Sequence, residues 1–66
     1  MNGKEIVQAY INLFNARRAV DGEPPIPPGE ISLYEKVLTM APAGVLDVAG
    51  WKAEQYAKAE VQKMKK

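Results

Sequence analysis

The sequence predicts an all-α fold: a small domain of three helices with an extended proline-rich connector between the first and second. Apolar residues recur at helical spacing in three stretches, and no alternating strand pattern is longer than a few residues. A run of prolines separates the first two stretches. The 66 residues are too few for two separate cores, so we expect one domain spanning residues 1–66.

The first helix is expected over about residues 3–20. Asn2 can act as its N-cap and Glu5 completes a capping box, while Met1 and Ile6 stand at the positions of a hydrophobic staple. Asp21-Gly22 ends the helix, because glycine readily adopts the left-handed conformation. At about 100° per residue, the apolar residues on one face are Ile6, Val7, Tyr10, Leu13, Phe14 and Val20.

The connector is expected over residues 21–31. Glu-Pro-Pro-Ile-Pro-Pro at residues 23–28 cannot be helical, because proline lacks an amide hydrogen and restricts the residue before it. The S-x-x-E pattern of Ser32 and Glu35 predicts that a second helix begins there and runs over about residues 33–41, where Pro42 ends it. The apolar face of this helix would hold Leu33, Tyr34, Val37 and Met40.

A third helix is expected over about residues 48–64, with Asp47 as its cap and Leu46 and Trp51 as a staple. Its apolar stripe is small, because alanines dominate it. Small side chains bury little area, and a marginal core with an alanine stripe would suit a helix-mediated homodimer. The stripe consists of Ala49, Ala53, Tyr56, Ala57 and Met64.

The composition excludes several kinds of chemistry. The chain has no cysteine and no histidine, which removes disulfides, thiolate chemistry and the usual zinc ligands. Ser32 is the only serine and Thr39 the only threonine, and neither hydroxyl has a histidine to activate it as a nucleophile. We therefore expect no enzyme activity, no catalytic residues, no cofactor and no metal. No apolar run is long enough to cross a membrane, and no export signal opens the chain, which predicts a cytoplasmic protein.

Three residues are candidate contacts for a protein partner. Trp51 is the only tryptophan and points away from the alanine stripe, as a binding hot spot would; the alternative is a staple onto Leu46. Arg17 falls within the apolar arc and, with Arg18, could bind a carboxylate or phosphate of a partner. The alternative is that the guanidinium of Arg17 pairs within the chain, with Asp21, Glu23, Glu30 or Glu35.

The proline segment and the basic carboxyl end are further candidates. Pro24 and Pro27 have the PxxP spacing of polyproline ligands, but no basic residue flanks them, and a stiff connector that packs Ile26 on the core explains the segment equally well. Residues 51–66 hold five lysines against two glutamates, either as a solvated helix end or as a phosphate contact. The phosphate contact would use Lys58, Lys63, Lys65 and Lys66.

These observations favour a small non-enzymatic protein–protein interaction module of the adaptor, inhibitor or virus-encoded accessory type. It would act through an exposed helix face on another protein or on its own copy. The alternative is a nucleic-acid-associated accessory protein that uses the basic third helix. Sequence-specific major-groove reading is disfavoured, because the turn that contains Pro42 is long and the third helix opens on Gly50 and alanines.

Overall fold

The computed structural model describes residues 3–65 and confirms the all-α fold with three helices. Helix α1 spans Gly3–Val20, α2 spans Pro28–Met40 and α3 spans Trp51–Met64, and a 3₁₀ helix, η1, spans Ala43–Val45. No strand occurs in residues 3–65. The sequence-predicted cap at Asn2 and staple partner Met1 lie outside the described residues.

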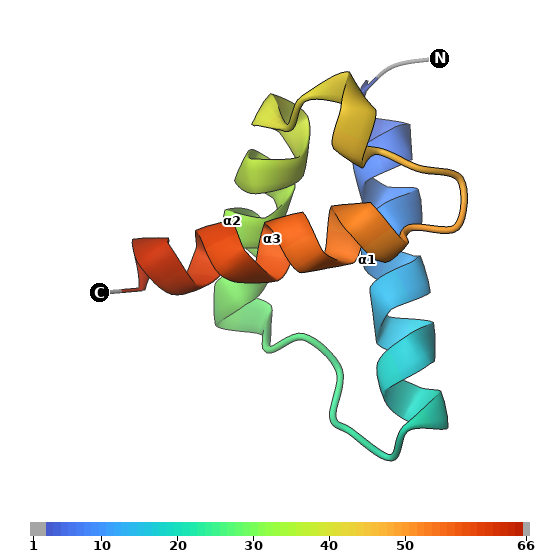
Figure 1. The fold of residues 1–66 in the computed structure, drawn as a ribbon. Helices are drawn as coiled ribbons and strands as arrows, with labels where there is room; N and C mark the ends of the chain where they lie inside the picture. Colours follow the sequence, from blue (N-terminus) through green and yellow to red (C-terminus); the bar gives the residue numbers. More distant parts are fainter. Residues whose placement is uncertain (1–2, 66) are drawn as a thin grey trace.

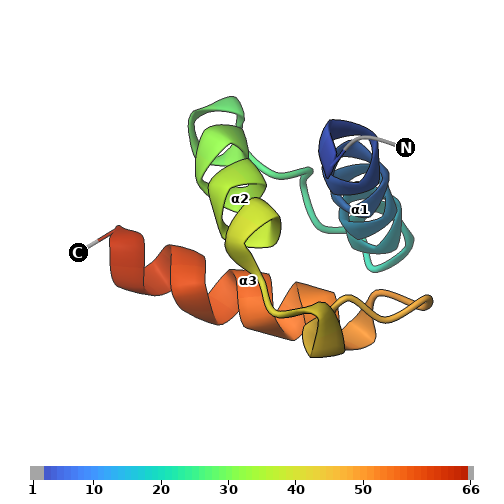
Figure 2. The same ribbon diagram turned by 90° about the horizontal axis from the view of Figure 1, so that it is seen from above.

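The helices form two layers. α1 and α2 lie side by side and run in opposite directions, and α3 crosses in front of both (Figure 1). Seen from above, α1 and α2 make one layer and α3 the other (Figure 2). The core lies where the three helices meet, and its buried residues are Val7, Ile11, Phe14, Ile26, Tyr34, Val37, Leu38, Ala53, Ala57 and Val61.

Helix α1 buries a narrower face than its sequence predicts. Val7, Ile11 and Phe14 are buried, in a row spaced four and three residues apart that packs into the core. Ile6 and Val20 were expected on the buried face, but they are 39% and 86% exposed. The prediction was wrong for these two residues, because a helical-wheel projection shows where apolar residues lie on a helix. It does not show which side of the helix its neighbours cover. α1 therefore keeps an apolar row that no other helix covers.

The connector is shorter than predicted, because α2 begins at Pro28 and not near residue 33. Ser32 lies inside the helix, so its capping-box prediction was wrong. Proline is favoured in the first helical turn, where no amide hydrogen is needed, and its fixed φ already suits a helix. The prolines thus keep the connector in an extended conformation and also start the helix. Met40, expected on the buried face of α2, is 72% exposed at the helix end.

The buried Ile26 fastens the connector to α1. In Pro24-Pro25-Ile26-Pro27-Pro28 only Ile26 carries an amide hydrogen, and its side chain is 3% exposed. The Ile26 N–H donates to Asn15 Oδ1 over 2.8 Å. This bond satisfies the one amide donor of the segment, because the prolines on either side have no N–H.

Helix α3 begins at Trp51, three residues later than predicted, after Gly50 in the left-handed region. Ala53, Ala57 and Val61 are completely buried, so these two alanines of the predicted stripe face the core. Ala49, which precedes the helix, and Met64 at its end are exposed, so the prediction was wrong for them. Small side chains let α3 lie close across the other two helices. Gly50 makes an equally close approach, because a Cβ built there would lie 2.6 Å from Leu13 Cδ2 of α1.

Replacing Gly50 should test this close approach against a matched control. Gly22 has nearly the same φ, +76° against +77°, but a Cβ there meets nothing within 4 Å. Gly22→Ala should cost about 1–2 kcal/mol from the left-handed backbone alone. Gly50→Ala should cost about 1–3 kcal/mol more, because its methyl group displaces Leu13. Urea unfolding followed by circular dichroism measures both, and equal losses would contradict the contact.

Removing the Asn15 acceptor should loosen the connector. Asn15→Ala leaves the Ile26 N–H without its partner and should lower the free energy of unfolding by about 1–3 kcal/mol. Hydrogen exchange at the Ile26 amide should accelerate by more than the global loss of stability predicts. Asn12→Ala is the control, because Asn12 makes an exposed side-chain contact with Gln8 and should change stability by less than about 0.5 kcal/mol.

Candidate functional site

A hollow of about 320 Å³ lies between the carboxyl half of α1 and the start of α3, and we call it the Trp51 hollow. Trp51, Glu54 and Lys58 line it from α3, one turn apart along one face. The remaining lining residues come from α1 and the first connector residues. They are Ala16, Arg17, Arg18, Val20, Asp21 and Glu23.

Arg17 and Trp51 stack on each other at this hollow. The guanidinium carbon of Arg17 lies 3.9 Å from the centroid of the Trp51 ring, which is a cation–π contact. Arg17 Nη2 donates to the backbone oxygen of Ala49, and Arg17 Nη1 forms an ion pair with Glu54 Oε1 at 3.9 Å, which is too long for a hydrogen bond. Arg17 therefore pairs within the chain, as one interpretation expected.

The expected partners of Arg17 were wrong, because α3 supplies them and not the acidic residues of the connector and α2. The sequence alone could not show that the start of α3 crosses α1 at this point. Trp51 is 60% exposed and lies on Arg17, whereas its predicted staple partner Leu46 packs against the core. Stacking on the guanidinium restricts the indole to one orientation while most of the ring stays in contact with solvent.

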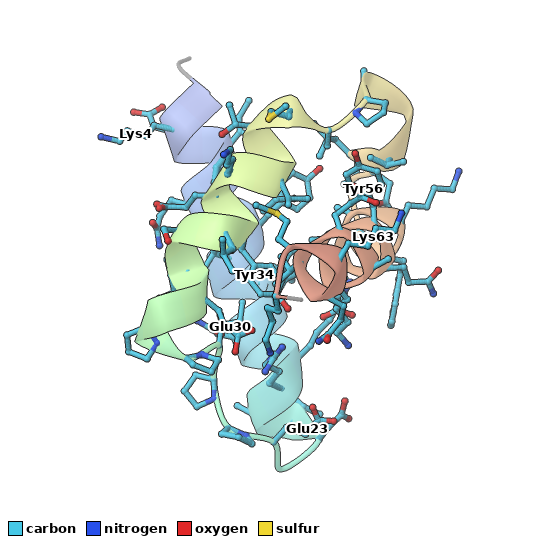
Figure 3. All side chains as sticks on the ribbon, turned by 90° about the vertical axis from the view of Figure 1, so that its left-hand side faces the viewer. Lys4, Glu23, Glu30, Tyr34, Tyr56 and Lys63 are labelled. Atoms are coloured by element: carbon cyan, nitrogen blue, oxygen red, sulfur yellow. The ribbon has the colours of Figure 1, made fainter. Side chains whose placement is uncertain are left out.

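Arg18 turns the other way and joins three elements. Its Nη1 donates to the backbone oxygen of Pro24 over 3.4 Å, and its Nη2 donates to the Tyr34 hydroxyl over 3.4 Å. Tyr34 lies at the centre of the bundle in Figure 3, while Glu23 lies near its lower end. Arg17 and Arg18 thus contact different elements and do not present two parallel guanidinium groups to a single anion.

Asp47 holds the start of α3 in the position that exposes Trp51. Its Oδ2 accepts from the Trp51 N–H at 3.0 Å, and its Oδ1 accepts from the N–H groups of Lys52 and Ala53 at 3.1 and 3.3 Å. Its backbone oxygen accepts from the Tyr10 hydroxyl at 2.8 Å, which ties the segment to α1. Asp47 caps the helix as predicted, although Gly50 occupies the N-cap position itself.

These contacts shift two pKa values. Loss of solvation pulls the pKa of Asp47 upward, but the backbone N–H groups of Ala53, Trp51 and Lys52 together bring it below its ordinary value. Burial, and then the charge of Asp47, raise the pKa of Tyr10. Tyr10 therefore stays a neutral hydrogen-bond donor to Asp47 throughout the physiological range.

The charges at the Trp51 hollow nearly cancel. Three basic side chains, Arg17, Arg18 and Lys58, face three acidic ones. Of the other lysines proposed for phosphate contact, Lys63 forms an ion pair with Glu60 at 3.0 Å and Lys65 pairs with Glu30 at 3.4 Å. Lys63 lies in the last turn of α3, and Lys65 directly follows the helix. Lys66 lies outside the described residues.

The candidate prolines lie on the surface of the connector. Pro24 and Pro27 are exposed, while Ile26 between them packs into the core. The Pro24 backbone oxygen already accepts from Arg18. The structure therefore anchors the connector at its centre and leaves both proline rings in contact with solvent.

Sequence reasoning missed Asn15, Tyr10 and Gly50 as the residues that hold the site together. One signal was present for Asn15: an apolar residue enclosed by prolines has a single amide hydrogen to satisfy, and a nearby amide side chain is a suitable acceptor. The contacts of Tyr10 and Gly50 depend on how α3 crosses α1, and nothing local in the sequence encodes that crossing.

No protein-family model, no curated protein and no solved structure matches the chain. Residues 3–65 hold no cluster of acidic side chains with the grouping of a metal site. None of the helices described above has the length and apolar character needed to cross a bilayer. The geometry of the Trp51 hollow and of the helix faces around it is therefore the basis for the functional argument.

The lowered pKa of Asp47 predicts a loss of stability in acid. Because the folded chain binds this proton less tightly than the unfolded chain, the contribution of Asp47 is complete above the unfolded pKa of about 3.9. It is lost as the pH falls through the lower folded pKa. Asp47→Asn keeps a capping side chain but cannot titrate. The stability advantage of the wild type over this variant should shrink from pH 5 downward in thermal unfolding, and a constant difference would contradict the assignment.

Proposed function

We propose that the chain is a non-enzymatic protein–protein interaction module that acts through the face around the Trp51 hollow. The observation that carries the proposal is the exposed Trp51 ring, stacked on Arg17 beside a partly apolar hollow. Tryptophan and arginine are the residues most enriched in binding hot spots, and here they lie in contact. The type of module, whether adaptor, inhibitor or virus-encoded accessory protein, and its cytoplasmic location stay predictions.

Preorganisation supports this proposal. A free tryptophan side chain loses rotamer freedom when a partner binds it, and that loss weakens binding. The stacking of Trp51 on Arg17 favours one orientation of the ring before binding and so reduces that loss. Arg17 is held in turn by Ala49 and Glu54, so the aromatic surface is supported by backbone and by charge. A partner would meet a surface that is already ordered.

Mixed charge favours a protein surface over a phosphate backbone. Basic groups that bind nucleic acid need a net positive field, and the acidic residues around the Trp51 hollow cancel most of it. Two of the lysines proposed for phosphate contact are already paired with glutamates. The nucleic-acid alternative therefore has less support, and weak binding to duplex or single-stranded DNA at low salt is the expected result.

The buried Ile26 supports the connector role of the proline segment. A polyproline ligand docks as a free extended strand, whereas this segment is fixed at its centre by Ile26 and by its bond to Asn15. Pro24 and Pro27 stay candidate contacts at the edge of the interaction face, because Arg18, which lines the hollow, also binds Pro24.

Trp51→Ala should weaken partner binding strongly and leave the fold intact. The ring is largely exposed, so its removal should cost less than about 1 kcal/mol of stability. As a hot spot it should contribute about ten-fold or more to affinity. The measurement is affinity capture of the tagged chain from its source cells, quantified by mass spectrometry. Met40→Ala is the matched control, because Met40 is 72% exposed on α2, away from the hollow.

Partners that the wild type and Met40→Ala retain, but Trp51→Ala loses, would support the proposal. Equal capture by all three forms would contradict it. Strong, salt-sensitive binding of the purified chain to DNA would favour the nucleic-acid alternative instead.

A further inference from the structure

Helix α1 carries a second apolar row on the side away from the core. We call it the outer stripe, and it consists of Ile6, Ala9, Leu13, Ala16 and Val20. Successive members are three, four, three and four residues apart, which is the a/d spacing of a coiled coil. Ala9 and Ala16 are exposed, Leu13 is half-buried, and Val20 is 86% exposed.

Both halves of the outer stripe line open hollows. Ile6, Ala9 and Leu13 border one of about 390 Å³, which also contains Val48, fully exposed on the segment before α3. Ala16 and Val20 border the Trp51 hollow. In Figures 1 and 2 the segment before α3 passes along one side of α1. The stripe thus follows the length of an 18-residue helix, about 27 Å, with apolar side chains beside it at both ends.

We propose that the outer stripe pairs with the outer stripe of a second copy of this chain, with the two α1 helices antiparallel. The inference goes beyond the proposed function, because the pairing uses the outer stripe and does not depend on Trp51. The order of large and small residues along α1 favours this pairing. Every a position holds a large side chain, and every d position holds alanine. The a positions are Ile6, Leu13 and Val20, and the d positions are Ala9 and Ala16.

Reversing one helix of a pair places a positions opposite d positions. Each layer of an antiparallel α1 pair would therefore join one large side chain to one alanine, which is the interdigitation that close packing needs. One register sets Ile6 opposite Ala16 and Leu13 opposite Ala9. A second register sets Leu13 opposite Ala16 and Val20 opposite Ala9. The outer stripe of α1 is therefore complementary in side-chain size to the same stripe running in the opposite direction.

A parallel pair would fit poorly. Its layers would alternate between two large residues and two alanines, so the distance that suits one layer would leave voids or clashes in the next. Since Ala53 and Ala57 of the stripe predicted on the third helix are buried in the core, the stripe on α1 is the one available for self-association.

Sedimentation equilibrium from about 10 µM to about 1 mM tests the pairing. The weight-average mass of the wild type should rise from the 7.3 kDa of one chain toward twice that value. Ala9→Glu and Ala16→Glu place a charge inside the pair and should weaken it at least ten-fold. Both sites are exposed and glutamate is a good helix former, so the fold should survive. Ala59→Glu, an exposed alanine of α3, is the matched control and should pair like the wild type.

Spin labels determine the relative orientation of the two α1 helices. Because the chain has no cysteine of its own, one introduced cysteine carries the only label. Lys4→Cys and Ala19→Cys mark the two ends of α1, about 22 Å apart along its axis. In an antiparallel pair, the short intermolecular distance joins a label at 4 on one copy to a label at 19 on the other. In a parallel pair it would join two labels at 4, at about 10 Å.

A wild type that stays at one-chain mass at all concentrations overturns the self-pairing, and so does dimerisation that both glutamate variants retain. A short distance between two labels at position 4 overturns the antiparallel order. None of these results removes the proposed function, which fails only if capture by the monomer is independent of Trp51. Conversely, if the capture of partners does not depend on Trp51 but the α1 dimer is confirmed, Trp51 is not a hot spot and the proposed pairing stands.

Discussion

The segment between η1 and α3 is fastened to α1, and this attachment sets where α3 begins. The Tyr10 hydroxyl binds the backbone of Asp47, and Arg17 binds the backbone of Ala49. Gly50 then lies so close to Leu13 that the Cβ of any larger residue would have to displace the Leu13 side chain. These contacts aim α3 across the bundle, which brings Ala53, Ala57 and Val61 onto the core and leaves Trp51 at the edge. The candidate site is thus a product of the same contacts that complete the fold.

Local signals predicted the fold class well. The helical periodicity, the proline run and the cap at Asp47 are properties of neighbouring residues, and they determine three helices with an extended connector. Local signals failed where two of them predicted different starting residues for the same helix. At the start of α2, the preference of proline for the first helical turn outweighed the S-x-x-E pattern, because a fixed φ and a missing amide both suit that position.

The site was predictable only in part. One interpretation of the sequence had Trp51 exposed, because it lies off the apolar stripe, and one had Arg17 paired within the chain. Both interpretations start from the angles on a single helix. The partners of Arg17 depend on the crossing of α1 and α3, which no single-helix argument contains. The same limitation explains Ile6 and Val20, whose exposure depends on which side of α1 the other helices cover.

The sulfur atoms of the described chain lie where oxidants can reach them without reaching the core. The chain has no cysteine, and both Met40 and Met64 have exposed side chains at helix ends. Conversion of a thioether to a sulfoxide makes the side chain polar, which disrupts a protein when it happens inside. Here the new polar group would face water, so oxidative stress should leave the three-helix packing unchanged.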